Sequence, residues 1–119
     1  MSTRCNIHFD QEGETIANIY RHSDGYPEAV LPDLQEFFAA VQEQTLDTRF
    51  SDPSYLAAKF VVWQAERFSR SGRPLNFLSL GIVNEDAKDG EWVYTVHCHN
   101  KWNEPGFPKV THRKAGIFA

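Results

Sequence analysis

The chain has 119 residues, of which 41% are hydrophobic and 13% aromatic, and its 12 basic and 16 acidic residues give a net charge of −4. This length predicts a single domain over residues 1–119, and the aromatic content excludes a disordered chain. The negative charge argues against non-specific binding to duplex nucleic acid. Because no apolar run approaches the about 20 residues of a membrane span and no secretory signal is visible, we expect a cytoplasmic protein without membrane contact.

The first predicted elements form a β-hairpin. Cys5, Ile7 and Phe9 alternate with polar residues, which is the period of a half-buried strand. Residues 11–13 end in glycine and predict a turn, and residues 15–21 predict the returning strand.

Two helices are predicted next. The first spans residues 32–44, with Pro32 at the first helical position. Its apolar face contains Leu34, Phe37, Phe38 and Val41, and its opposite face, which carries Asp33, is predicted to be solvated. The second helix begins after Asp52, a candidate N-cap, and ends near Ser69.

The second predicted helix is apolar on two sides. One stripe contains Leu56, Phe60 and Trp63, and the other contains Ala58, Val61, Val62 and Ala65. A small sheet offers one face to cover a helix, so the second stripe indicates a partner subunit, most simply in a twofold dimer. The alternative is a helix enclosed between the sheet and the first helix.

The remaining elements are predicted to be strands. Residues 75–83 read as a strand, Asp89-Gly90 as its hairpin turn, and the segment from Trp92 as the returning strand. A last short strand is predicted over residues 109–114. The order predicts an α+β fold, with an antiparallel sheet, two helices packed on one face, and the second helix at a homodimer interface.

The densest cluster of polar side chains lies between the hairpin and the first helix. Arg21 has a planar guanidinium suited to a phosphate or carboxylate, His22 and Asp24 could hydrogen-bond to each other, and Tyr26 could stack on a base. The alternative is a tight turn in which the aspartate caps its own backbone.

Other candidate ligand-binding side chains are scattered along the chain. Arg49 precedes the second helix, whose N-terminus favours anions, although it could instead pair with Asp47 or Asp52. Candidate stacking surfaces for a base are Phe77, Trp92, Trp102 and Phe107.

Metal binding and covalent catalysis are weakly indicated. His97 and His99 would share one face of a strand, but Cys98 points away from them, so we expect no metal site. Cys5 and Cys98 fall on predicted apolar faces and are interpreted as buried free thiols. Glycine-rich phosphate loops and familiar nucleophile or metal motifs are missing from the sequence, so we expect no catalytic residue and no cofactor.

Four segments resemble a group of small proteins encoded mostly by bacteriophages. They are Thr3-Arg4-Cys5-Asn6-Ile7, Ile19-Tyr20-Arg21-His22-Ser23-Asp24-Gly25-Tyr26-Pro27, Leu31-Pro32-Asp33-Leu34 and Tyr55-Leu56-Ala57-Ala58-Lys59-Phe60. Within that group the chain is similar to the Thoeris anti-defence proteins of the first type. These are sponges that sequester cyclic ADP-ribose isomers made by bacterial TIR-domain enzymes without cleaving them, and some also hold cyclic oligonucleotides at separate sites.

This resemblance implies a homodimer, or a hexamer built from dimers, in the cytoplasm of the bacterial host. It implies Arg21 and Arg49 as phosphate ligands, Phe77 and Asn84 as contacts to the nucleoside, and either Lys109 or Arg113 as a basic residue completing the pocket. Pockets of this kind are expected near the dimer interface.

Three interpretations from different classes remain. The leading one is a non-catalytic protein that binds a cyclic nucleotide immune signal through His22, Asp24, Tyr26 and the residues implied above. The second is a hydrolase of nucleotides or phosphoesters that uses His22 with Asp24, or a metal at His97 and His99. The third is a protein-binding module that inhibits a host factor.

Overall fold

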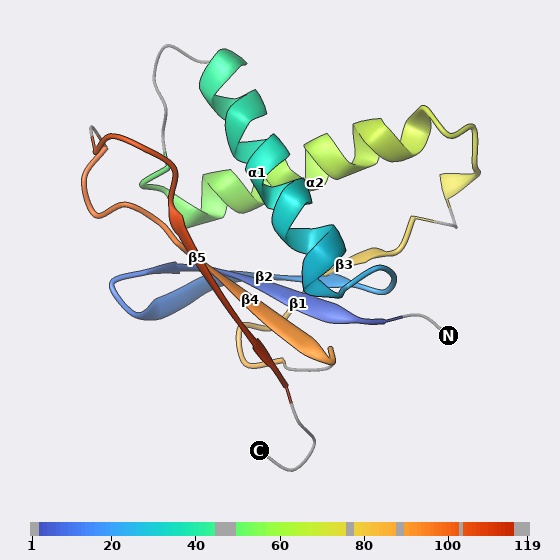
Figure 1. Ribbon diagram of the computed structural model, residues 1–119, viewed down its shortest axis with the longest axis horizontal. Coiled ribbons are helices and arrows are strands. Elements are labelled where there is room, and N and C mark those ends of the chain that lie inside the picture. The colour runs from blue at the N-terminus through green and yellow to red at the C-terminus, as the bar shows by residue number, and fades with distance from the viewer. Residues whose placement is uncertain (1–2, 45–49, 76–77, 88–89, 103, 116–119) are drawn as a thin grey trace.

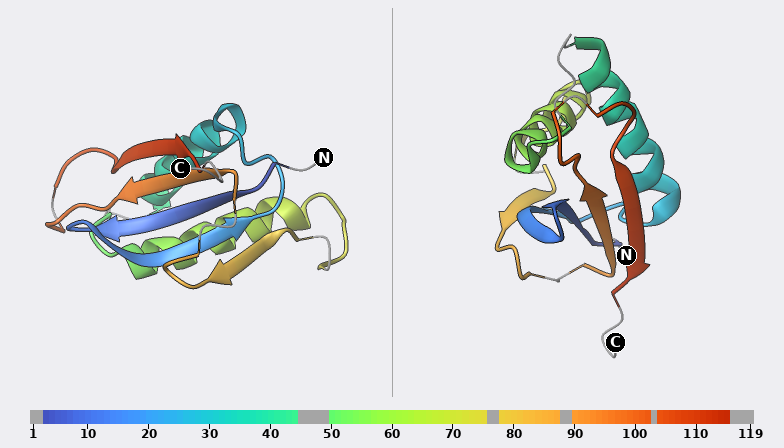
Figure 2. Two further views of the ribbon diagram at one scale, coloured as in Figure 1. Left: turned by 90° about the horizontal axis from the view of Figure 1, so that it is seen from below. Right: turned by 90° about the vertical axis from the view of Figure 1, so that its left-hand side faces the viewer.

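The computed structural model describes residues 3–44, 50–75, 78–87, 90–102 and 104–115 as a five-stranded sheet with two helices on one face (Figure 1). The strands are β1 (Cys5–Gln11), β2 (Glu14–Arg21), β3 (Leu80–Val83), β4 (Trp92–His97) and β5 (Lys109–Lys114), and the helices are α1 (Pro27–Gln44) and α2 (Pro53–Ser69). The strand order β3-β2-β1-β4-β5 can be followed from the helix-free side (Figure 2). The fold is α+β, as predicted.

The predicted N-terminal hairpin is confirmed. β1 and β2 pair antiparallel and close through a two-residue turn, in which Gln11 lies opposite Glu14. Glu12 and Gly13 have φ angles of 53° and 80°, which is the left-handed geometry of the tight turns that match the twist of a hairpin.

The predicted hairpin of β3 and β4 is wrong. β3 pairs antiparallel with β2, whereas β4 pairs parallel with β1, so one of the four described strand pairs of a mostly antiparallel sheet is parallel. The chain between them crosses the sheet face that the helices leave open, where Asn18 Nδ2 donates to the carbonyls of Asn84 and Ala87 at 2.9 and 2.8 Å. Gly90 supports this crossing, because a Cβ there would lie 2.4 Å from Cys5 Cα.

β3 is shorter than predicted. The strand begins at Leu80, and the preceding residues include a turn in which the amide of Leu78 donates to the carbonyl of Leu75 at 2.9 Å. The predicted strand at residues 109–114 is confirmed as β5, which pairs antiparallel with β4.

The two helices differ in how well their starts were predicted. α1 begins at Pro27, five residues before the predicted start, and contains Pro32 inside it. Proline is favoured at the first helical position, and the Tyr26 carbonyl accepts the first amides of the helix. α2 begins where predicted, with the Asp52 carboxylate accepting a hydrogen bond from the Tyr55 amide at 3.3 Å.

The core lies between the helices and the sheet. From the sheet it takes Cys5, Ile7, Phe9, Tyr94 and Val96, and from the helices Leu34, Phe37, Phe38, Leu56 and Phe60, all essentially inaccessible to solvent. Phe37 and Phe60 meet edge to face with ring centroids 5.2 Å apart, so the predicted apolar face of α1 and the first stripe of α2 join the two helices to each other.

Candidate functional site

A polar cavity of about 280 Å³ lies where the end of β2, the C-terminal part of α2 and the segment that leads into β3 meet. We call it the arginine pocket. Its lining residues are Arg21, Ser23, Gln64, Arg67, Phe68, Leu78, Ser79 and Leu80. Arg21 enters it because this residue pairs with Cys5 in the sheet, and directly paired residues of antiparallel strands share a face, here the face covered by the helices.

A single carboxylate holds the two arginines of the pocket. Asp33 on α1 contacts Arg21 through one oxygen at 2.8 Å and Arg67 through the other at 3.1 Å. Arg21 also donates from Nε to the Ser23 carbonyl at 2.9 Å, and its side chain is only 11% exposed. Two guanidinium groups therefore share one half-buried countercharge, and the side chain of Arg67 is 45% exposed. The excess of one positive charge leaves the pocket electropositive.

Glu36 adds little to this balance. Its carboxylate lies 3.6 Å from Arg67, but the Glu36 side chain is 65% exposed. Solvent screens such an ion pair strongly. The charge that a ligand in the pocket meets is therefore set by Arg21, Arg67 and Asp33.

The pocket also offers neutral hydrogen-bond donors. Gln64 Nε2 is buried and has no hydrogen-bond partner among the described residues, an arrangement that costs free energy until an acceptor is supplied. Ser23 Oγ and Ser79 Oγ lie 3.1 Å apart beside the guanidinium groups. A guanidinium carries five N–H donors, so Arg21 retains donors beyond the two bonds named above. The arrangement suits an anion with several acceptor oxygens.

Part of the pocket lining is apolar, with Phe68, Leu78 and Leu80. A ligand that combines a charged group with a flat or apolar part therefore fits the lining better than a bare ion. Sequence analysis did not identify these apolar residues, nor Asp33, Gln64 and Arg67. Asp33 is not on a solvated face as predicted, since its side chain is only 19% exposed.

The hydrogen-bond partner of His22 is a residue other than the predicted Asp24. His22 Nδ1 is hydrogen-bonded to the Tyr20 hydroxyl at 2.8 Å, on an exposed side chain. Asp24 has a φ angle of 54° and is exposed in the segment that leads into α1. Tyr26 is 40% exposed and begins the helix through its carbonyl. Of the predicted ligand residues in this cluster, Arg21 lines the arginine pocket, and the neighbouring Ser23 lines it as well.

The other implied ligand residues are dispersed. Arg49 and Phe77 lie outside the described residues. The Asn84 side chain accepts a hydrogen bond from the Asp86 amide at 3.2 Å, which stabilises the local turn. Lys109 and Arg113 pair with His97 and Val93 on the helix-free face of the sheet.

Arg113 lines a different cavity from Arg21. That cavity has a volume of about 500 Å³ and includes His8, Asp10 and Thr95. Arg21 and Arg113 therefore lie on opposite faces of the sheet, and one chain cannot bring both to the same phosphate.

The prediction that His97 and His99 share a face is wrong. His97 is exposed and contacts Thr111 Oγ1 at 2.8 Å. β4 ends there, and the backbone of His99 then donates to the Phe50 carbonyl at 2.8 Å while its ring packs on Phe50. Within the described residues, no group of three side chains of the metal-binding types is close enough to hold an ion.

Both cysteines are buried free thiols, as predicted. Burial raises the pKa of the Cys5 thiol and that of the Cys98 thiol to about 12 each. Because the thiolate is the reactive form, neither cysteine is a suitable nucleophile in the folded chain at neutral pH.

The candidate stacking residues divide between core and surface. Phe107 packs against Phe38 and Phe50, and Trp92 lies beside His112. Trp102 is 66% exposed. In the arginine pocket the aromatic side chain is instead Phe68.

Comparisons with known proteins leave the site to be interpreted from its own geometry. The sequence matches no protein-family model, and neither a curated protein nor a solved structure is significantly similar to it. Neither described helix has the combination of length and hydropathy that a membrane crossing requires.

Proposed function

We propose that this protein binds a small phosphate-bearing nucleotide in the arginine pocket and retains it without cleaving it. The ligand class suggested by the sequence resemblance is a cyclic ADP-ribose isomer, and its sequestration would counteract a bacterial anti-phage signal. The observation that carries the proposal is the pair of arginines on one carboxylate, Arg21 and Arg67 on Asp33, beside the buried amide of Gln64.

The chemistry of the lining supports this ligand class. Arginine side chains form short, charge-assisted hydrogen bonds with phosphate oxygens, and the hydroxyls of Ser23 and Ser79 add donors or acceptors. The aromatic side chain of Phe68 in the lining suits the ring of a nucleoside. At about 280 Å³, the cavity is near the lower end of the about 300–1,000 Å³ typical of ligand sites. It would enclose a phosphate and its neighbouring group while the rest of the ligand reaches the rim.

The residues that line the pocket support retention of the ligand without cleavage. Its lining contains donors and apolar groups, which bind and orient a phosphate but do not activate water. The His22 ring, which is the base in one of the two hydrolase mechanisms considered above, is hydrogen-bonded to the Tyr20 hydroxyl. Sequestration requires only that the site bind the ligand tightly, and a preformed pocket binds a ligand at low entropic cost.

Calorimetric titration with a cyclic ADP-ribose isomer tests this proposal. We expect saturable binding by the wild type and a loss of about 2–4 kcal/mol of binding free energy in Arg21→Ala, because truncation leaves the phosphate without its buried partner. Arg113→Ala, on the other face of the sheet, is the matched control and should bind like the wild type. Heat denaturation of the loaded protein should release the ligand intact, as chromatography would show.

Each alternative outcome is distinct. Recovery of a cleaved product would replace the proposal with the hydrolase interpretation. Lost binding in Arg113→Ala with normal binding in Arg21→Ala would move the site to the opposite face of the sheet. Absence of any nucleotide binding would favour the protein-binding module.

A further inference from the structure

Gln64 is the residue of the arginine pocket whose hydrogen bonding is incomplete in the ligand-free protein. Its Nε2 atom is buried and has no acceptor among the described residues. The other polar side chains of the lining have partners, since the two arginines contact Asp33 and the two serine hydroxyls are hydrogen-bonded to each other at 3.1 Å. A buried amide donor without an acceptor costs free energy. The Gln64 amide is therefore the donor in the pocket that most needs an acceptor from a ligand.

Gln64 lies on the same side of α2 as Arg67 and Phe68. It precedes Arg67 by three residues and Phe68 by four, and side chains with these spacings are neighbours on a helix surface, with Cβ atoms about 5–6 Å apart. All three side chains line the pocket. Because charge-assisted hydrogen bonds are about twice as strong as neutral ones, a phosphate is held by the guanidinium groups. The Gln64 amide and the Phe68 ring are then left to contact the group that is attached to the phosphate.

We infer that Gln64 is the specificity-determining residue of the arginine pocket and that it selects a phosphate ester over inorganic phosphate. The terminal torsion of a glutamine is broad, so the amide turns toward an acceptor in the cavity at little cost. It donates to a neutral oxygen of the esterified group, such as a hydroxyl or ring oxygen of a sugar. This inference rests on the proposed function, because it requires a phosphate between Arg21 and Arg67.

Selection of this kind is what a sequestering protein requires. Two arginines alone bind inorganic phosphate as well as they bind an esterified phosphate, and a common anion would then occupy the pocket. A bare phosphate leaves the buried amide of Gln64 without its acceptor, whereas an ester with an oxygen beside the phosphate supplies one. Sites that are built to hydrogen-bond a polar group discriminate strongly against a ligand that lacks it.

The stability of the ligand-free protein provides the first test. Gln64→Met removes the amide, retains the length of the side chain and keeps a good helix former in α2. We expect this variant to unfold at a higher urea concentration than the wild type, because the donor without an acceptor is gone. Gln35→Met, at an exposed position of α1, is the matched control and should leave the midpoint unchanged. A lower midpoint for Gln64→Met would overturn the inference, because the amide would then have a partner within the fold.

Calorimetric titration of the full chain with inorganic phosphate and with ribose 5-phosphate measures the selection. The wild type should bind the ester more tightly than inorganic phosphate. In Gln64→Met the affinity for ribose 5-phosphate should fall about tenfold, the effect of one hydrogen bond from a buried donor, while the affinity for inorganic phosphate should not change. Arg21→Ala should lose affinity for both probes.

The two probes separate a failure of this inference from a failure of the proposed function. An equal loss of affinity for both probes in Gln64→Met would show that the amide contacts the phosphate itself, and equal affinities in the wild type would show that the pocket does not select. Either result would overturn the inference and leave the phosphate pocket in place. A wild type that binds neither probe would overturn both proposals.

Discussion

Asp33 determines how the arginine pocket meets an anion. Its two oxygens hold Arg21 and Arg67 in place, which reduces the entropy that a ligand must remove from these long side chains on binding. The same carboxylate lowers the positive charge of the pocket, so the unliganded state is not left with two unbalanced guanidinium groups. One residue thus stabilises the empty pocket and limits its attraction for phosphate.

Substitution Asp33→Asn separates these two roles. The asparagine retains the shape but removes the countercharge of the nearly buried Arg21, so we expect the free energy of unfolding to fall by about 2–4 kcal/mol. A phosphate-bearing ligand would then supply the missing negative charge and recover most of that loss. Urea denaturation with and without ligand measures both effects. Equal destabilisation in the two conditions would mean that no anion binds beside Arg21.

The sequence allowed only part of this pocket to be predicted. Arg21 was found because it lies in a dense polar cluster, but Asp33 and Arg67 are 34 residues apart and meet only through the packing of α1 on α2. Asp33 was also assigned to a solvated face because it lies on the side of the helix opposite the apolar residues. The spacing of Gln64, Arg67 and Phe68 on one side of α2 was the available signal. It indicates a pocket only when the segments that pack beside α2 are known.

At the scale of elements, sequence signals that have one structural interpretation gave correct predictions. Signals that have two interpretations did not. The Asp52-Pro53 cap of α2 and the turn at Gly13 each have one structural interpretation. Gly90 has two, since a glycine is needed both in a tight hairpin turn and where two backbones come close. The structure uses it for the second purpose, against Cys5, and the sequence could not distinguish the two.

The two prolines of α1 provide a matched test at this scale. Pro32 is exposed inside the helix, where it removes a backbone hydrogen bond and crowds the carbonyl four residues earlier. Pro32→Ala should therefore raise the free energy of unfolding by about 1 kcal/mol, after allowing for the greater entropy of the unfolded chain. Pro27→Ala, at the favoured first position, should produce no gain. Thermal denaturation monitored by circular dichroism compares the two, and equal effects would contradict this account of the helix start.

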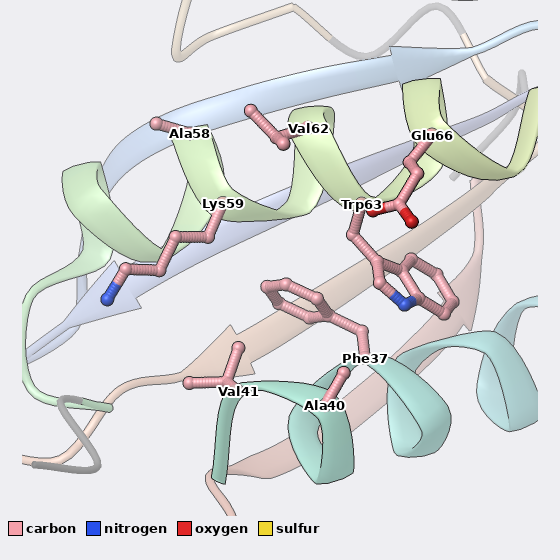
Figure 3. Close-up of a pocket in the computed structure, with 8 residues that line it drawn as sticks. All are labelled: Phe37, Ala40, Val41, Ala58, Lys59, Val62, Trp63 and Glu66. Atoms are coloured by element: carbon pink, nitrogen blue, oxygen red, sulfur yellow. The ribbon is translucent and has the colours of Figure 1, made fainter. Parts of the chain in front are cut away.

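The whole molecule presents two candidate surfaces on either side of α2. Trp63 lines an apolar groove of about 320 Å³ between α1 and α2 (Figure 3), and Arg67 lines the arginine pocket. The guanidinium of Arg67 lies 4.8 Å from the centre of the Trp63 ring. The dimer predicted from the sequence would cover the groove, whereas the donors of the pocket all come from one chain. We therefore expect assembly and ligand binding to be separable, although the sequence had suggested pockets at the dimer interface.

Val62→Asp tests whether the two surfaces act independently. Val62 is mostly exposed, so the aspartate should leave the fold intact, while two carboxylates facing each other across the twofold axis should abolish the dimer. The monomer should still bind the nucleotide within about threefold of the wild-type affinity, because a change remote from the phosphate contacts removes little binding free energy. Calorimetric titration of the variant measures its affinity for the nucleotide, and light scattering checks that the variant is a monomer. If binding disappears together with the dimer, a residue of the partner subunit must complete the pocket, and the arginines on Asp33 would be only half of the site.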